Sequence, residues 1–127
     1  MVIDKVGAVI LKDKRILLVR KINHDKFIIP GGKRDGYESD LQCLRRELKE
    51  EIDCNLKKTS FITEVHGKAE WTEQELHMKL YLTELIGDPR PSSEIEELVW
   101  IKKCEEVPVS KAFKESVYPE LIKRQLI

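Results

Sequence analysis

Apolar runs separated by charged turns predict short buried strands at the start of the chain. Val6 to Leu11 is apolar without interruption, which is typical of a strand covered on both faces. The charged turn KDKR leads to a second run, ILLV at residues 16–19, and we expect the two runs to be neighbouring strands of one sheet. The run FIIP follows, and Gly31 with Gly32 would end that strand and let a bound group approach the backbone.

The next segment predicts a helix from Ser39 or Asp40, both good N-cap residues, to about Asp53. The segment contains neither Gly nor Pro. Its apolar residues recur at spacings of three and four, as one face of a helix requires. They are Leu41, Leu44, Leu48 and Ile52. We expect this face to pack on the sheet.

The second half of the chain predicts further strands and a last helix. Residues 60–69 and 75–86 read as strands, and 87–93 as a loop broken by Gly and Pro. The 75–86 strand alternates, with Leu76, Met78, Leu80 and Leu82 on one face and His77, Lys79, Tyr81 and Thr83 on the other. Residues 97–101 predict a short strand and 118–127 an amphipathic helix carrying Leu121, Ile122 and Leu126. The order predicts an α/β fold with a mixed sheet between helices.

Length and charge limit the partners of this fold. The 127 residues suit one core, so we expect a single domain over 1–127. Lys plus Arg equals Asp plus Glu at 23 each, so no overall field favours a nucleic-acid polymer or a membrane. Three widely spaced cysteines argue for a reducing compartment. With no basic segment before the first apolar run and no run near the roughly 18 residues of a membrane span, we expect a cytoplasmic protein.

Three glutamates on the predicted helix stand at helical spacings, namely Glu47, Glu50 and Glu51. A solvated, ion-paired face is the ordinary explanation of such a run. However, Glu47 and Glu51 repel each other at i and i+4, and Glu50 and Glu51 lie in the last turn, where the helix dipole favours cations. A divalent cation would reverse both costs, because Mg²⁺ and Mn²⁺ prefer oxygen ligands.

The residues around this cluster resemble the Nudix box of the Nudix hydrolase superfamily, in its MutT-like branch. The box runs from Gly32 through five residues to Glu38, and through seven more to Arg46, Glu47, Leu48, one further residue, Glu50 and Glu51. Two positions at its end depart from the pattern, since Asp53 replaces the usual Gly and Cys54 the usual aliphatic residue.

The resemblance implies an α/β/α sandwich and hydrolysis of a nucleoside diphosphate linked to another group, with Mg²⁺ or possible Mn²⁺ as cofactor. By position, Glu47, Glu50 and Glu51 become metal ligands or water activators, and the Gly32 carbonyl becomes a backbone ligand. Glu38 and Arg46 would form an ion pair that orients Glu47. A fourth carboxylate is expected before a later strand, where Glu94 is preferred to Glu96 and Glu97.

The same resemblance favours a small nucleotide as the substrate. The stretch KAEWTEQ lacks the Pro and Tyr that mark relatives acting on ADP-ribose and dinucleoside polyphosphates. A nucleoside triphosphate, including an oxidised one, is therefore preferred, giving the monophosphate and pyrophosphate. Alternatives are hydrolysis of ADP-ribose or nucleotide sugars, a module that senses a nucleotide without cleaving it, and a purely structural domain. The protein would be a monomer or homodimer.

Contacts to the substrate are predicted from Arg20, Phe27, Lys33 and Trp71. Trp71 would stack on a base, or else cover the core. Basic residues near the FIIPGG run would receive phosphates, and these are Arg20, His24, Lys26, Lys33 and Arg34. His66 and His77 stand at spacings from each other and from the cysteines that no zinc module uses, so no structural zinc is expected.

Overall fold

The strands of the computed structural model, which describes residues 2–70 and 72–127, form two sheets. The larger sheet has the order β4-β1-β6-β5. Its strands are β1 (Val2–Val9), β4 (Gly31–Gly32), β5 (Asn55–Lys68) and β6 (Glu75–Ile86). Strand β1 runs parallel to β6, whereas the β1–β4 and β5–β6 pairs are antiparallel. This sheet is therefore mixed, as the sequence predicts.

The smaller sheet contains the end of a run that we expected to form one strand, because Leu11 belongs to this sheet and Val6 to Val9 belong to the larger one. Its order is β2-β3-β7, with β2 at Leu11–Lys12, β3 at Arg15–Lys21 and β7 at Ile95–Lys102. The predicted pairing of the first two apolar runs holds only at Leu11, which pairs with Ile16 on β3, and is wrong for Val6 to Val9. The chain changes sheets at Ile10, whose carbonyl accepts a hydrogen bond from the Leu17 N–H at 3.0 Å, and β1 pairs with β4 and β6 instead.

The FIIP segment forms single bridges rather than a regular strand. Ile28 bridges to Val19 on β3, and the Ala8 N–H on β1 donates to the Pro30 carbonyl at 2.8 Å. The segment is thus held between the two sheets. Gly31 and Gly32, predicted to end a strand, themselves form the short strand β4.

The β5–β6 hairpin confirms the two strands predicted there, with one difference. Leu76, Met78 and Leu80 are buried, as the alternation predicts. Thr83, predicted for the polar face, is also buried at 3% exposure, and its hydroxyl donates to the Tyr81 carbonyl at 2.9 Å. The reason is that helix α1 covers the end of this second face, so both faces of β6 are packed there.

Helix α1 (Asp40–Ile52) forms with the ends that the sequence predicts. At its start, the Gln42 N–H donates to the Ser39 hydroxyl and the Ser39 N–H to the Gln42 side chain, a complete capping box. At its end, Asp53 takes the left-handed conformation at φ 51° that the family's glycine would adopt readily. Leu44, Leu48 and Ile52 are fully buried, whereas Leu41 is 37% exposed and lies off the packed face.

The C-terminal helix starts earlier and ends sooner than predicted. A π-helical turn, η1 (Phe113–Val117), leads directly into α2 (Tyr118–Lys123). The helix stops because Gln125 adopts a positive φ of 57°. Leu126 still packs against the apolar core, although it lies beyond the helix.

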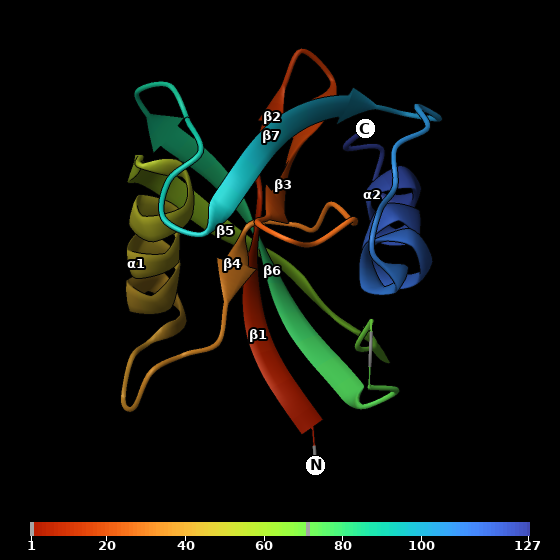
Figure 1. The fold of residues 1–127 in the computed structure, drawn as a ribbon, viewed down its shortest axis with the longest axis horizontal. Coiled ribbons are helices and arrows are strands. Elements are labelled where there is room, and N and C mark those ends of the chain that lie inside the picture. Colours follow the sequence, from red (N-terminus) through yellow and green to blue (C-terminus); the bar gives the residue numbers. More distant parts are fainter. Residues whose placement is uncertain (1, 71) are drawn as a thin grey trace.

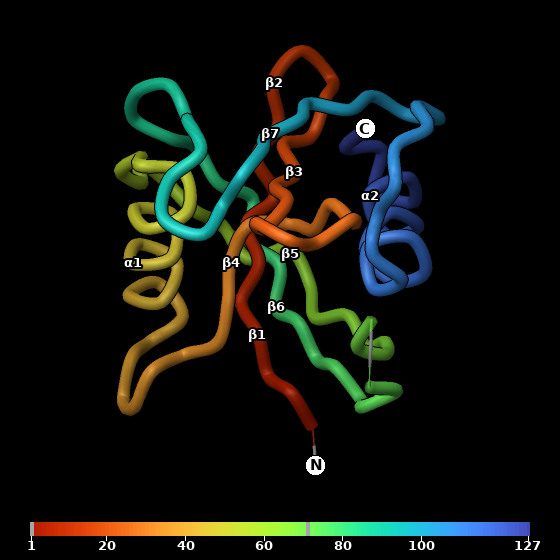
Figure 2. Tube along the Cα trace, in the orientation of Figure 1, coloured from red at the N-terminus to blue at the C-terminus, as the bar shows by residue number. Residues whose placement is uncertain are grey.

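Helix α1 lies on one side of the sheets and η1 with α2 on the other, with both termini away from α1 (Figure 1, Figure 2). Two apolar clusters follow from this layering. One contains the buried residues of α1, and the other contains Phe113, Val117 and Leu121. The α/β/α sandwich is therefore confirmed. None of the helices within 2–70 and 72–127 is long and apolar enough to cross a membrane.

Candidate active site

The carboxylate face of α1 lies directly against β4. A Cβ added to Gly32 would stand 2.6 Å from the Glu47 carboxylate, so the absence of a side chain at residue 32 makes room for that carboxylate. The thiol of Cys43, one turn earlier on α1, donates to the Gly32 carbonyl with a sulfur–oxygen distance of 3.6 Å. Burial raises the pKa of this thiol to about 11, so it remains a donor. The structure brings Gly32 and Glu47 together, as the box predicts.

Glu51 is the buried member of the glutamate cluster, at 2% exposure. The Gly31 N–H donates to its Oε1 at 2.9 Å. Burial raises the pKa of Glu51 to about 8, and the nearby negative charge of Glu47 acts in the same direction. The sequence gives no sign of this burial, because it arises when α1 docks on β4. Glu51 can therefore hold or release a proton near neutral pH when no cation is present.

Glu47 and Glu50 flank the cluster on the more open side. Arg46 Nη1 lies 2.8 Å from Glu47 Oε1 and 3.6 Å from Glu50 Oε2. Burial raises the pKa of Glu47, whereas the Glu50 side chain is 52% exposed. Glu50 thus has the freedom to turn toward an incoming ion or substrate, whereas Glu47 is already fixed beside the backbone.

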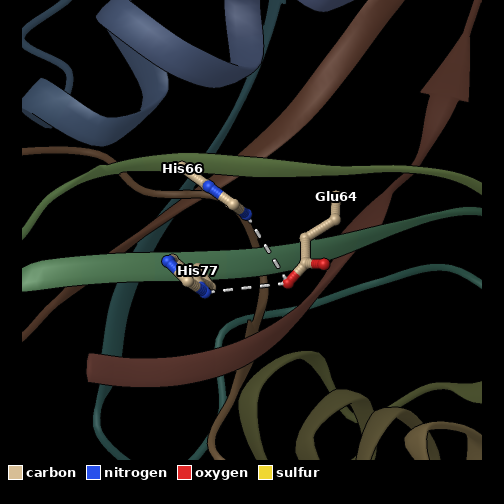
Figure 3. A group of neighbouring side chains, drawn as sticks. All are labelled: Glu64, His66 and His77. Atoms are coloured by element: carbon tan, nitrogen blue, oxygen red, sulfur yellow. Dashed lines mark ion pairs between the residues drawn. The ribbon is translucent and has the colours of Figure 1, made fainter. Parts of the chain in front are cut away.

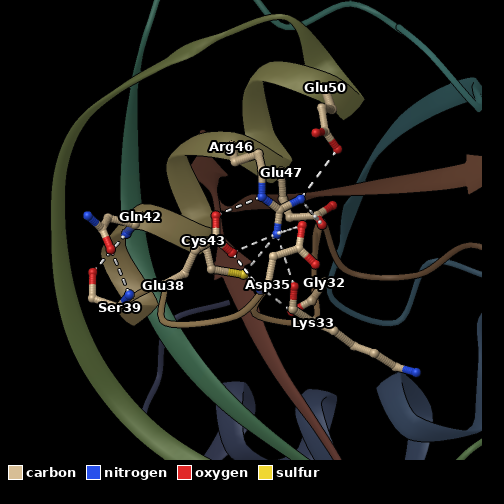
Figure 4. A network of polar contacts seen from close by, with 10 residues as sticks. All are labelled: Gly32, Lys33, Asp35, Glu38, Ser39, Gln42, Cys43, Arg46, Glu47 and Glu50. Atoms are coloured by element: carbon tan, nitrogen blue, oxygen red, sulfur yellow. Dashed lines mark hydrogen bonds and ion pairs between the residues drawn. The ribbon is translucent and has the colours of Figure 1, made fainter.

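Arg46 holds the loop after β4 against α1 (Figure 4). Its Nε and Nη2 bind the two oxygens of Glu38 at 2.8 and 2.9 Å, and Nη2 also donates to the Lys33 carbonyl at 3.1 Å. Glu38 also accepts from the Asp35 N–H at 2.7 Å. Hydrogen bonds from Arg46 and Asp35 lower the pKa of Glu38 to about 2. The Glu38–Arg46 pair expected from the box is present, and it orients Glu47 through the same guanidinium.

Glu94 lies in the loop directly before β7, and its backbone is bonded to the residue that follows β3. Its carbonyl accepts a hydrogen bond from the Ile22 N–H at 2.8 Å, and the Ser92 N–H donates to the Glu51 carbonyl at 3.0 Å. The two alternatives point elsewhere, because Glu96 and Glu97 bind Arg20 at 2.8 and 3.1 Å. Of the three glutamates, only Glu94 lines the cavity beside α1.

That cavity measures about 390 Å³ and joins the carboxylates to cationic and apolar walls. Its basic side chains are Lys5, Lys21, His24 and Lys33. Its apolar wall includes Ile3, Ile28, Leu76, Met78 and Phe113. Burial, followed by the charges of Lys21 and Lys33, lowers the pKa of Lys5. Lys5 and Lys21 were not predicted from the sequence, although a lysine beside an uninterrupted apolar run was a signal for Lys5.

The predicted substrate contacts are placed unequally around this cavity. Lys33 lines it, whereas Arg20 and Phe27 do not. Arg20 is occupied by Glu96 and Glu97, and its guanidinium stands 5.8 Å from the ring centre of Phe27. Phe27 itself is 6% exposed and belongs to the core. Trp71 lies outside the described residues.

The other basic residues predicted to receive phosphates divide in the same way. His24 lines the cavity. Lys26 lies 3.7 Å from Glu70 and Arg34 lies 3.2 Å from Asp40, so acidic partners already hold both side chains. Lys5 and Lys33 line the wall and are positioned to meet an anion, whereas Lys21, which also lines it, lies 3.8 Å from Glu94.

The oxygen donors fit a hard divalent cation. Burial raises the pKa values of Glu47 and Glu51, and the charge of Glu47 adds to the rise at Glu51, although Arg46 partly offsets the rise at Glu47. Glu47, Glu50, Glu51 and the Gly32 carbonyl would hold Mg²⁺ or Mn²⁺ here, all through oxygen. Such an ion would neutralise phosphate charge and lower the pKa of water at the site.

We expect Arg46→Lys to weaken binding of Mn²⁺ about 10- to 100-fold, because a lysine cannot hold Glu38, Glu47 and the Lys33 carbonyl together. Titration followed by the paramagnetic signal of free Mn²⁺ would measure the change. Arg45→Lys, an exposed neighbour on the same helix, is the matched control and should bind as the wild type does. Equal loss in both variants would show that Arg46 does not act through its hydrogen bonds.

We expect metal-free protein to lose stability as pH rises, because the folded state keeps a proton on Glu51 that the unfolded chain releases. The pKa of Glu51 is raised from 4.5 to about 8, so the loss starts near pH 4.5 and is complete near pH 8. Glu51→Gln should remove it, and the variant should gain about 4 to 5 kcal/mol over the wild type between pH 4.5 and 8.5, at roughly 1.4 kcal/mol per pKa unit. Urea unfolding in EDTA at both pH values measures this difference, and a pH-independent difference would contradict the prediction.

The comparisons with known proteins agree with the geometry. The family model of the NUDIX domain matches residues 1–123. Among curated proteins, the RNA pyrophosphohydrolase of Ruthia magnifica subsp. Calyptogena magnifica is 24% identical, and the match covers 93% of this chain and 78% of that protein.

Solved structures with the same fold include a MutT NUDIX hydrolase from Burkholderia pseudomallei, 26% identical with a TM-score of 0.77. That match covers 90% of this chain and 94% of the other. The NUDIX domain of Shewanella oneidensis NrtR, solved with ADP ribose, is 17% identical with a TM-score of 0.78, covering 98% and 89% of the two chains. With the family model spanning nearly its whole length and Glu47 and Glu50 of the box lining one cavity, the chain belongs to the NUDIX family and is a Nudix hydrolase.

Proposed function

We propose that the protein is a divalent-metal-dependent pyrophosphohydrolase that converts a nucleoside triphosphate to the monophosphate and pyrophosphate. One observation carries the proposal, namely a single cavity lined by Glu47, Glu50 and Glu94, by lysines, and by an apolar wall. A triphosphate has the matching parts, because its phosphates suit the lysines and the bound cation and its base suits the apolar wall.

The residues of the cavity have different roles in this reaction. Lys5, Lys21 and Lys33 would bind the phosphate oxygens and draw the anhydride toward the carboxylates. Water attacks phosphorus, the bond from phosphorus to the bridging oxygen breaks, and that oxygen leaves on the departing phosphate. A carboxylate takes the proton of the attacking water. Glu51 and Glu94 are the two groups proposed for this step, Glu51 from the buried side and Glu94 from the open side.

A second candidate substrate is the triphosphate end of an RNA chain. The curated relative from Ruthia magnifica, named as an RNA pyrophosphohydrolase, favours it. The anhydride to be cut is the same in both substrates. The balanced charge of this chain, 23 basic against 23 acidic residues, provides no general attraction for a polymer, so the free nucleotide is the first candidate.

Release of pyrophosphate from the triphosphates, and of a nucleoside monophosphate from the other substrates, in MgCl₂ tests the proposal across four substrate groups. These are ordinary and oxidised nucleoside triphosphates, a short RNA with a triphosphate end, ADP-ribose, and nucleotide sugars. Glu51→Gln serves as the blank. Cleavage of free triphosphates by the wild type but not by the blank supports the first candidate. Faster cleavage of the RNA than of free triphosphates supports the second. Binding without cleavage would replace both with a nucleotide-sensing module.

We expect Glu94→Gln to lower turnover about 10²- to 10⁴-fold if Glu94 carries the proton, since that is the usual worth of a general base. Glu97→Gln is the matched control, because Glu97 lies nearby on β7 but binds Arg20 and does not line the cavity. The control should keep the wild-type rate. Full activity of Glu94→Gln would assign the proton to the box glutamates alone.

A further inference from the structure

Strand pairing brings together two histidines that are distant in the sequence. His66 on β5 and His77 on β6 are direct partners in the antiparallel ladder. Their rings stack with centroids 3.8 Å apart and planes inclined by 9°. Both side chains point to the same side of the hairpin as Glu64 (Figure 3). The expectation of no zinc rested on distance along the chain, which the hairpin makes irrelevant here.

Glu64 completes a three-atom ligand set. Its Oε2 lies 3.9 Å from His66 Nε2 and 3.9 Å from His77 Nδ1. The ligand atoms of these residues all lie within 4.8 Å of one another. Two ligand atoms of a tetrahedral zinc ion stand roughly 3.3 Å apart, given zinc–ligand bonds of about 2.0 to 2.1 Å. The rings must turn out of their parallel stack, and the ligand atoms must close by up to about 1.5 Å. Side-chain rotation can supply this movement, because Glu64 is 38% and His66 57% exposed.

The surroundings of His77 make its Nδ1 the nitrogen available to a metal. Its Nε2 is buried and has no hydrogen-bond partner, and the Glu75 carboxylate lies 3.5 Å from it. A small side-chain rotation would let Nε2–H donate to that carboxylate and would leave the lone pair on Nδ1, an arrangement that recurs behind metal-bound histidines. The lone pair of Nδ1 then faces Glu64 and His66.

We propose that Glu64, His66 and His77 form a zinc site separate from the active site. Two imidazole nitrogens and one carboxylate oxygen suit Zn²⁺, whereas the oxygen donors around Glu47 suit Mg²⁺. The two places are also distinct in space, because none of the three residues lines the 390 Å³ cavity. Water would fill the fourth position.

A separate hollow of about 280 Å³ adjoins the proposed site and is lined by Asp4, Glu64 and His77, among others. Lys79 also lines it, and its ammonium group lies 3.6 Å from Asp40 on α1. A cation at the three ligands would therefore have Asp4 beside it, and of the basic residues in the hollow, which are Lys5, Arg34 and Lys79, the last two are paired with Asp40. Zinc there would join β5 to β6 near the hairpin end, whose residues Ala69 and Glu70 line the active-site cavity.

Histidine NMR with Zn²⁺ tests the proposal directly, because the chain has three histidines. Two belong to the proposed site, and His24 lines the active-site cavity and reports on zinc there. With Mg²⁺ present, one equivalent of Zn²⁺ should shift the ring nitrogens of His66 and His77 together and leave His24 unchanged. Shifts of His24 alone, or no shifts, would overturn the site.

Two variants separate ligation from packing. His66→Phe keeps a ring stacked on His77 but has no nitrogen, and Glu64→Gln keeps the shape of the carboxylate without its charge. We expect both to weaken zinc binding at least about 100-fold, measured by competition with a zinc indicator, with wild-type thermal stability in EDTA. Lys68→Gln, at the end of the same strand, is the control and should bind normally. Unchanged zinc affinity in His66→Phe would show that the two histidines only stack on each other and do not bind the metal.

Discussion

Replacing Glu51 by glutamine is expected to reduce turnover about 10²- to 10⁴-fold while leaving the fold intact. The glutamine retains the shape of Glu51 and can still accept the Gly31 N–H bond. It cannot carry the negative charge that the cation requires, nor accept a proton from water. Pyrophosphate release measures the rate, and circular dichroism reports the fold. Glu84→Gln, an exposed position on β6, is the matched control and should retain full activity.

Glu50→Gln is expected to give a loss of the same order, although Glu50 is far more exposed than Glu51. The carboxylates around one metal act as a unit, so a double variant should lose little more than either single one. Full turnover in both single variants, with folded protein, would mean that the charged face of α1 is only a solvated surface.

Gly31→Ala is expected to destabilise the protein by about 3 kcal/mol or more. The added Cβ would stand 2.1 Å from the Val6 carbonyl, and the φ of 139° at this residue strains any other side chain. Neither problem can be relieved by a side-chain rotation, because the obstacle is the backbone of β1. Urea unfolding measures the loss, and unchanged stability would show that β4 can move away from β1.

Gly32→Ala should give the opposite result, and it is the natural comparison. Its added Cβ meets the carboxylate of Glu47, the far end of a flexible side chain, so the chain can fold with Glu47 displaced. We therefore expect near-normal stability together with a large loss of metal binding and turnover. Of these two adjacent glycines, Gly31 would thus be needed for stability and Gly32 for metal binding and turnover.

Helix α1 could be predicted from the sequence almost residue by residue, because its determinants are local. Ser39 and Gln42 cap its start within one turn, and Asp53 ends it through its own backbone conformation. The box spacing similarly predicts that Gly32, Arg46 and Glu47 meet, and the structure places them in contact. The roles of these residues in the reaction stay predictions.

Other features depend on contacts that a linear pattern does not contain. The burial of Glu51 requires the docking of α1 on β4, and the transfer of the chain between sheets at Ile10 follows from tertiary packing. Arg20 was predicted to meet phosphate, but Glu96 and Glu97 on the neighbouring strand bind it first. A lysine in a solvated turn and one in a cavity wall look alike in a sequence, which is why Lys21 was missed.

The loop between β6 and β7 is anchored at one end only. The Arg90 and Ser92 N–H groups donate to the carbonyls of Ile52 and Glu51, and the Arg90 side chain also binds Asp53. These bonds fix the approach to Glu94, whereas residues 87–89 precede the anchor. Chain inserted at 87–89 would therefore lie before the anchored residues and leave Glu94 in place, so the loop could lengthen here while the carboxylates keep their spacing.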